Sequence, residues 1–260
     1  MNRCSLAGWL GLCLLATAVS AADDPYEGLF FPLPDAVVTI DAKTKATALE
    51  IIPPCFARET KGTKLEINTT RGWGWVERKQ LMSMKEAEKY CDSHKTEAYA
   101  LFVRSTTHLV KDQADKSLVD LTAAIKADPK FAPAYYSRGG LYAEKQEFAK
   151  ALADFKEGVK LAPKDLLAAN DLAWFRATCP DAKFRDGKEA LAEATRICEE
   201  TGHKQEDFLD TLAASYAEVG DFKNAVEWAT KLTKIDPEND EFKDRLKLYK
   251  AKKPFRDDGK

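Results

Sequence analysis

The sequence predicts a mainly α-helical protein, in which helix pairs follow one another along the chain behind a small β-rich module. Two observations predict the helix pairs. Pro129 and Pro163 are 34 residues apart, and the pattern of small and aromatic residues between them returns over 206–239. A period of about 20 to 50 residues indicates a repeat architecture. The β-rich module is predicted by β-branched and aromatic runs within 35–82.

The segment 132–165 contains the clearest helix pair. Gly139 and Ala151 are small where two antiparallel helices would approach closely, and Phe155 would fill the space between them. Pro163 would end the second helix, because proline lacks the N–H group that a helix interior needs. We therefore expect two amphipathic helices joined by a short turn.

Three further copies of this pattern are expected. The copy over 206–239 is strong, the copy over 98–131 is weaker, and the copy over 166–202 is altered. A last helix is expected over 240–252, because the final repeat of such an array would otherwise leave its apolar face in water. The whole array is expected to occupy 95–253, followed by a tail over 254–260.

The altered copy has an extended connection between its two helices. Its loop over 178–187 is about five residues longer than the repeat standard. Cys179 lies in this loop and Cys198 in the helix that follows it. One hypothesis is a disulfide between them, which would stabilise the fold by roughly 2–4 kcal/mol in the loop-closure model. The alternative is two buried free thiols.

Two more cysteines, Cys55 and Cys91, offer a second and weaker candidate pair. The sequence has no Cys-x-x-Cys motif, so a redox-active role is not favoured.

The signature positions of 132–165 and 206–239 resemble the tetratricopeptide repeat, and the altered copy resembles a variant repeat of exported bacterial proteins. In that family the first helix of each pair lines a concave groove, where a protein or peptide partner binds. By register, the resemblance places the following residues along the groove: Tyr99, Phe102, Tyr136, Asn170, Trp174, Asp207 and Asp210. The alternative is that some of them, Trp174 above all, pack against the next repeat. The Lys/Asn clamp that some relatives use for C-terminal carboxylates has no match.

Opposite charges sixteen residues apart occur in two of the copies. Arg104 and Asp120 form one such pair, and Arg138 and Asp154 form the other. Since the spacing puts them on facing helices of one repeat, we expect ion pairs with a structural role.

The β-rich module over 35–82 resembles a small bacterial SH3-like barrel. The resemblance rests on 61–67, which reads Lys-Gly-Thr-Lys-Leu-Glu-Ile, followed by the Gly-Trp-Gly-Trp-Val-Glu run over 72–77. Trp73 and Trp75 would share one face of a strand, where they would either bind a ligand or fill the core. A proline-containing linker is expected over 22–34, and a connecting helix over 83–94, opened by a Ser83–Glu86 capping box.

Residues 1–21 have the features of a secretory signal peptide: Arg3 near the start, an apolar run, and small residues before Ala22. The rival interpretation is an uncleaved anchor. We expect cleavage and an exported protein, either periplasmic or secreted.

The sequence contains no recognisable catalytic or metal-binding constellation. His94, His108 and His203 are scattered, without other ligands at metal-ligand spacing. The net charge of −2 gives no global field that would recruit nucleic acid. We therefore expect a non-enzymatic exported scaffold without a cofactor, which binds a protein or peptide partner in the groove. The alternative is cell-envelope binding, of peptide or cell wall, by the SH3-like module, with the repeats as a spacer.

Overall fold

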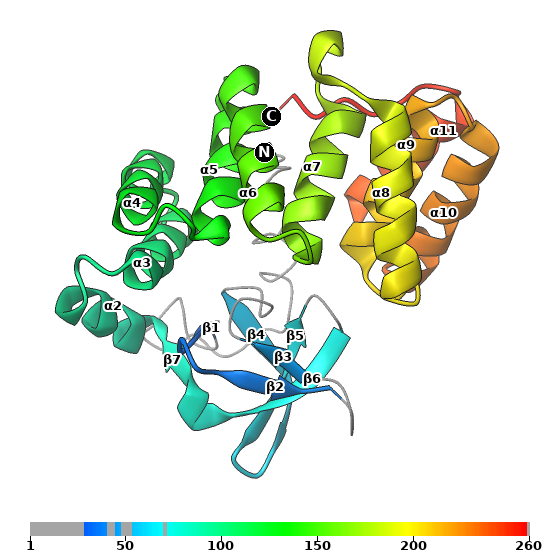
Figure 1. Ribbon diagram of the computed structural model, residues 1–260. Helices are drawn as coiled ribbons and strands as arrows, with labels where there is room; N and C mark the ends of the chain where they lie inside the picture. The colour runs from blue at the N-terminus through cyan, green and yellow to red at the C-terminus, as the bar shows by residue number, and fades with distance from the viewer. Residues whose placement is uncertain (1–28, 41–44, 48–53, 70–71, 259–260) are drawn as a thin grey trace. The chain divides into compact units, whose positions relative to one another are not determined.

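A computed structural model describes residues 29–40, 45–47, 54–69 and 72–258 (Figure 1). It divides between Leu141 and Tyr142 into an N-terminal and a C-terminal compact unit. The described chain is mainly α-helical, as predicted, and its ten helices follow a β region. The helices are α2 (Met84–Ser93), α3 (Ala98–Val110), α4 (Ala114–Ala127), α5 (Ala132–Glu144), α6 (Phe148–Leu161), α7 (Leu166–Thr178), α8 (Gly187–Glu200), α9 (Glu206–Glu218), α10 (Phe222–Ile235) and α11 (Asp240–Lys250).

The β region is one antiparallel sheet in the order β3-β2-β6-β5-β4-β1-β7. Its strands are β1 (Leu29–Pro32), β2 (Val37–Thr39), β3 (Lys45–Thr47), β4 (Cys55–Lys61), β5 (Lys64–Thr69), β6 (Gly72–Glu77) and β7 (Leu81–Ser83). Over the described residues the outermost strands β3 and β7 do not pair with each other, so the expected SH3-like barrel is corrected to an open sheet.

The strand β1 lies inside the range 22–34 for which the sequence predicts a linker, and that prediction is wrong for its last part. β1 pairs with β7 through Pro32, opposite Leu81, but its pairing with β4 involves only Leu29 and Phe30. Proline has no N–H group to donate to a ladder, and here it stands at the end of the strand, where only β7 pairs with it.

The core of the sheet is formed by seven buried residues: Ala36, Val38, Cys55, Leu65, Ile67, Val76 and Leu81. β6 approaches β2 so closely that a Cβ atom at Gly74 would lie 2.5 Å from Val38 Cγ1. The glycine between the two tryptophans is therefore needed for sheet packing. Trp73 is 41% exposed and Trp75 is half-buried, so neither of them fills this core.

The capping box that opens α2 is confirmed. Ser83 Oγ accepts a hydrogen bond from the Glu86 N–H group (3.3 Å), and Glu86 Oε2 accepts one from the Ser83 N–H group (2.7 Å). Two of the N–H groups that a helix start leaves without helical partners are satisfied in this way.

The repeat register is also confirmed. α3, α5 and α7 begin at Ala98, Ala132 and Leu166, the 34-residue spacing that the sequence predicts. Three of the turns between paired helices contain a left-handed residue, and the last copy, over 206–239, uses Gly220 (φ 82°). Asp112 (φ 58°) takes this conformation in the first copy, which aspartate tolerates better than most side chains.

Within the C-terminal unit, α7 packs on α8 and α9, α9 on α10, and α10 on α11. The predicted closing helix is α11, whose Tyr249 is fully buried beside Ala213, Ala217, Ala225 and Ala229. α11 thus covers the apolar face that α9 and α10 would otherwise expose.

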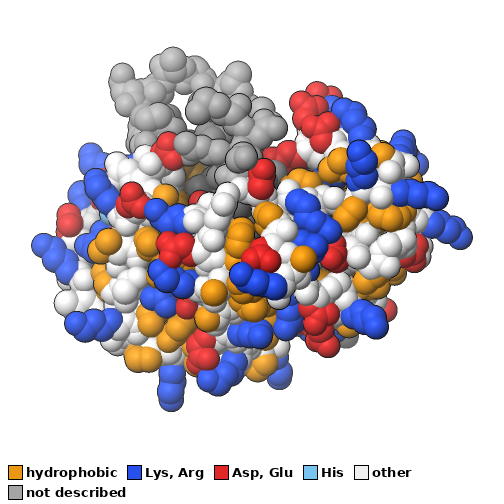
Figure 2. Space-filling view, turned by 90° about the horizontal axis from the view of Figure 1, so that it is seen from above, with side chains coloured by type: hydrophobic (Ala, Val, Ile, Leu, Met, Phe, Trp, Pro, Cys, Tyr) orange, Lys and Arg blue, Asp and Glu red, His pale blue; other side chains and the backbone are white. Residues whose placement is uncertain are grey.

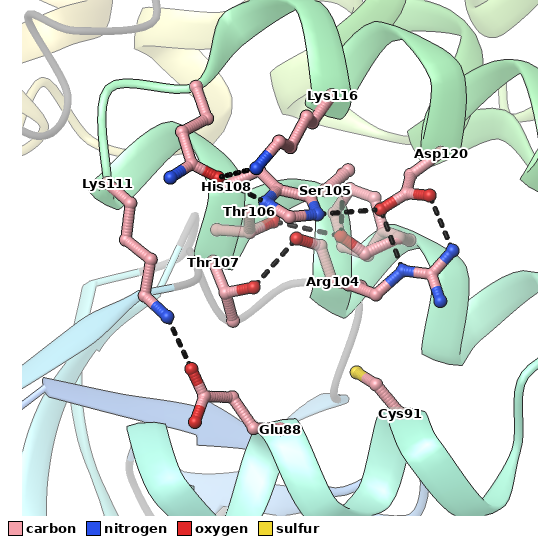
Figure 3. A network of polar contacts seen from close by, with 12 residues as sticks. Glu88, Cys91, Arg104, Ser105, Thr106, Thr107, His108, Lys111, Lys116 and Asp120 are labelled. Atoms are coloured by element: carbon pink, nitrogen blue, oxygen red, sulfur yellow. Dashed lines mark hydrogen bonds and ion pairs between the residues drawn. The ribbon is translucent and has the colours of Figure 1, made fainter.

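The ion pair between α3 and α4 is confirmed (Figure 3). Arg104 donates from Nε and Nη2 to the two carboxylate oxygens of Asp120, at 2.8 and 2.6 Å. The Asp120 side chain is 6% exposed, and His108 Nε2 lies 3.4 Å from its Oδ2 atom. The two-pronged geometry makes this pair stronger than an ordinary surface pair.

Side chains of both charge signs are mixed over the face that Figure 2 displays, in keeping with the net charge of −2. Across the described ranges, none of the helices combines the length and the apolar character needed to cross a bilayer. The predicted signal peptide 1–21 and the first part of the predicted linker lie outside the described residues.

Candidate functional site

Three of the predicted groove residues lie in the N-terminal unit, where they take part in packing. The Tyr99 hydroxyl donates to the Pro32 carbonyl oxygen (2.8 Å), and its ring meets Phe131 edge-on. Phe102 belongs to the core between α3 and α4, and Tyr136 is 7% exposed. Tyr99 therefore ties α3 to β1. We regard these three residues as structural.

The predicted groove residue Trp174, in the C-terminal unit, contacts the end of the chain. Its half-buried side chain donates from Nε1 to Asp257 Oδ2 (2.8 Å), and its ring lies 5.8 Å, centre to centre, from that of Phe255. Trp174 also packs against Ala214 on α9, so it contacts the next repeat, as in the alternative interpretation, as well as the C-terminal tail.

The tail makes three further contacts with the first helices of the repeats. The Asp257 N–H group donates to the carbonyl oxygen of Thr178 (3.0 Å), at the end of α7. Arg256 Nη2 lies 2.6 Å from Glu218 Oε2 on α9, and its Nη1 donates to the Ala177 carbonyl oxygen (3.3 Å). We call Trp174, Ala177, Thr178 and Glu218 the tail-docking surface. In Figure 1 the red C-terminal segment runs from α11 back to α7.

The extended loop of the altered repeat positions Glu218 of the tail-docking surface. Arg185 donates to the carbonyl oxygens of Cys179 (2.7 Å) and Pro180 (2.9 Å) and pairs with Glu218 Oε1 (2.9 Å). Because both the Arg185 and Glu218 side chains are mostly buried, Glu218 is fixed between two arginines, one from the loop and one from the tail. The longer loop thus positions the acceptor of Arg256.

Of the two alternatives for Cys179 and Cys198, a disulfide or two buried free thiols, the structure has the free thiols. Cys198 Sγ donates to the Phe208 carbonyl oxygen on α9 (3.3 Å), and burial raises the pKa of this thiol to about 12. The loop is held by Arg185 and needs no covalent bond. The pair of Cys55 and Cys91 is not formed either, since Cys91 is a free thiol that donates to the Ala100 carbonyl oxygen (3.2 Å).

A buried ion pair between Arg245 and Asp210 lies next to Trp174 of the tail-docking surface. Arg245 of α11 donates from Nε to Asp210 Oδ1 (3.0 Å) and from Nη2 to Oδ2 (2.9 Å), and both side chains are nearly inaccessible. The guanidinium also lies over the rings of Trp174 (5.6 Å) and Phe255 (5.3 Å). The predicted groove residue Asp210 therefore has a structural role. It holds the Arg245 guanidinium in place against the rings of Trp174 and Phe255.

The remaining predicted groove residues form an acidic neighbourhood. Burial, and then the charges of Asp210 and Glu206, raise the pKa of Asp207 to about 7. Burial also raises the pKa of Asp171 well above its usual value, and Asp207 adds to that shift. Asn170 is 4% exposed, and its Oδ1 atom accepts no hydrogen bond. Within the described ranges, no group of three or more metal-ligating side chains occurs.

The docking role of the tail was missed at the sequence level, where 254–260 is only the end of the chain. The available signal is Phe255 followed by Arg256, an aromatic and an arginine beyond the last helix. These residue types are enriched where proteins bind one another.

Comparison with known proteins identifies the repeats. A family model described as tetratricopeptide repeat matches residues 132–165 and 207–239, so the chain contains repeats of this kind. The comparison with curated proteins gave no match.

Solved structures with the same repeat fold cover more than half of the chain. A type IV pilus biogenesis factor, PilW, is 15% identical with a TM-score of 0.53, and the match covers 59% of this chain and 69% of PilW. The tetratricopeptide-repeat protein TTC0263 of Thermus thermophilus is 14% identical with a TM-score of 0.51 (64% and 88% covered). PilF of Pseudomonas aeruginosa is 15% identical with a TM-score of 0.50 (59% and 68% covered). At these identities the likeness is one of fold.

Proposed function

We propose that this protein is an exported, non-enzymatic scaffold that binds a protein or peptide partner through the first helices of its C-terminal repeats. One observation carries the proposal: α7 and α9 already hold an extended stretch of polypeptide, residues 255–257, through Trp174, Thr178 and Glu218. An indole N–H group, a carbonyl oxygen at the end of a helix and a fixed carboxylate are groups that recognise a peptide through both its backbone and its side chains.

The proposal is tested by capturing partners in the host with full-length protein and comparing single variants. Trp174→Ala is expected to lower the yield of the main crosslinked partner at least tenfold, because this ring is the central aromatic of the surface. Trp228→Ala is the matched control, since Trp228 is an equally half-buried tryptophan on α10, stacked on His203. Thermal unfolding followed by circular dichroism checks that both variants fold. A partner yield that Trp174→Ala leaves unchanged would contradict the proposal.

The export part of the proposal rests on residues 1–21 and has its own measurement. The mass of the protein purified from its host is expected to correspond to a chain that begins at Ala22. A chain that retains Arg3 would contradict cleavage.

A second candidate function, cell-envelope binding by the β region, is favoured by one observation. Trp73 on β6 is 41% exposed, and the Arg58 guanidinium lies over its ring at 4.3 Å, held by Glu66 (2.7 Å). An exposed, oriented aromatic of this kind provides a flat binding surface.

This candidate is tested on the full chain, because β1 and β7 belong to the same sheet, and a fragment over 35–82 would lack β1 and the last residue of β7. Trp73→Ala is expected to reduce co-sedimentation with purified cell walls at least tenfold. Val37→Ala, at a 40% exposed position on β2, is expected to have no effect. Equal sedimentation of the two variants would argue against this function.

A further inference from the structure

The last described residues of the chain have the geometry of a bound ligand. Each of three consecutive residues is recognised differently: Phe255 by the ring of Trp174, Arg256 by Glu218, and Asp257 by the Trp174 indole and the Thr178 carbonyl oxygen. All three side chains of this stretch are therefore held by residues of α7 and α9.

The tail is also separable from the helices that it contacts. α11 ends at Lys250, and Lys252 (φ 55°) turns the chain away from the helix axis. Residues 251–253 are exposed, and residues 254–257 are only half-buried. The repeat helices contact one another directly, and Tyr249 of α11 lies in their apolar core, while Phe255 of the tail packs against the edge of this core. Release of the tail would therefore uncover that edge but keep the contacts between the helices.

A tethered segment needs little intrinsic affinity to stay docked. A short flexible connection gives an effective concentration in the millimolar range, so a contact of modest strength is mostly occupied. A separate peptide with the same contacts must compete with this concentration, and it gains access in proportion to the fraction of time that the tail is released.

We infer that the tail is an internal ligand of the partner site, and that the partner is an extended peptide with an aromatic residue, an arginine and an acidic residue in succession. The charges of the surface support this class. Glu218 Oε2 lies 2.6 Å from Arg256 Nη2, while Arg185 pairs with its Oε1 atom, so the surface offers one carboxylate oxygen to a cationic side chain. The Trp174 N–H group has no charge and accepts nothing, so it selects a hydrogen-bond acceptor such as a carboxylate. The inference rests on the proposed function and specifies its ligand.

The test uses a released-tail variant of the full chain, which carries Phe255→Ala, Arg256→Ala and Asp257→Ala together. The probe is a fluorescein-labelled peptide, Lys-Pro-Phe-Arg-Asp-Asp, the sequence of residues 253–258. Fluorescence polarisation up to millimolar protein is expected to show saturable binding to the released-tail variant. Binding to the wild-type chain is expected to be at least tenfold weaker, because its own tail competes. Lys253→Ala, at an exposed position of the tail, is expected to behave like the wild type.

Two changes to the same assay check the recognition. Adding Trp174→Phe to the released-tail variant keeps an aromatic ring but removes the N–H donor, and it is expected to weaken peptide binding several-fold. Replacing arginine by glutamate in the peptide places like charges together at Glu218 and is expected to abolish binding. Circular dichroism of each variant confirms that the helices are retained.

The inference is overturned if the peptide binds neither chain, or if it binds wild type and released-tail variant equally. A concentration-dependent dimer of the wild type that the released-tail variant does not form would identify a second copy's tail as the occupant instead. If the peptide binds as expected but the captured partner is unaffected by Trp174→Ala, the internal ligand stands and the proposed function fails. The opposite pattern, with partner capture lost and no peptide binding, would leave the function standing without this ligand.

Discussion

Replacing Asp210 by alanine is expected to lower the free energy of unfolding by about 3–5 kcal/mol, because it leaves the guanidinium of Arg245 buried without its principal carboxylate. Arg245 is 4% exposed and donates two hydrogen bonds to Asp210. Glu241, a further acidic neighbour, lies at 3.4 Å and does not make this two-pronged contact. Urea unfolding followed at 222 nm measures the difference.

Two controls separate the buried charge from a general effect on the helices. Asp244→Ala, at an exposed position on α11 paired only with Lys247, is expected to change the stability by less than about 0.5 kcal/mol. The double variant Asp210→Leu with Arg245→Met is expected to recover most of the loss, since apolar residues of similar volume remove the desolvation cost of both charges. A loss below about 1 kcal/mol for Asp210→Ala would show that Arg245 reaches water.

Replacing Asp207 by asparagine is expected to change how stability depends on pH. Burial, helped by Asp210 and Glu206, raises the pKa of Asp207 to about 7 in the folded protein, from an ordinary value of 3.8, although Arg245 opposes the rise. Because the folded state holds this proton more tightly than the unfolded state, the stabilisation is complete below about pH 4 and is lost as the pH rises through 7. The slope from one such group approaches about 1.4 kcal/mol per pH unit between these limits.

Asp207→Asn is therefore expected to be progressively more stable than the wild type as the pH rises, with the gain levelling off above about pH 7. The pKa of Asp171 is raised in the same direction, so some loss of stability with pH remains in the variant. Asp244→Asn on the exposed face of α11 serves as the control and is expected to follow the wild-type curve. Thermal midpoints at several pH values between 4 and 8 make the comparison. A constant difference between Asp207→Asn and the wild type would contradict the raised pKa.

Sequence reasoning succeeded where the signal is local or periodic. The helix starts at Ala98, Ala132 and Leu166 follow from a repeat whose register is carried by small residues and proline. The capping box at Ser83 follows from a spacing of three residues at the start of one helix. The Arg104–Asp120 pair follows from a spacing of sixteen residues between the two helices of a repeat. Such spacings convert directly into distances because helix geometry is regular.

It succeeded less well where distant segments meet. β1 reads as a linker because Pro32 argues against a strand, and only the presence of β7 on one side shows that its missing N–H group does no harm. The repeat register placed Trp174 on the first helix of its repeat. It could not show that Asp257 accepts the hydrogen bond of the Trp174 indole, since the two residues are 83 positions apart in the sequence. The state of Cys179 and Cys198 was also not predictable from the sequence. Their proximity in the sequence made a disulfide one of two alternatives, but the loop is held by Arg185 and both cysteines are free thiols.

The sequence by itself thus determined the repeat, its register, the longer loop and the closing helix, because each is encoded within one or two helical turns or in a fixed period. Only the tertiary structure decided that the sheet is open, that Asp210 is buried with Arg245, and that the tail lies on α7 and α9. These features depend on which surfaces remain uncovered once the helices and strands have packed. These surfaces are buried by contacts between residues far apart in the sequence, and no local sequence pattern specifies such contacts.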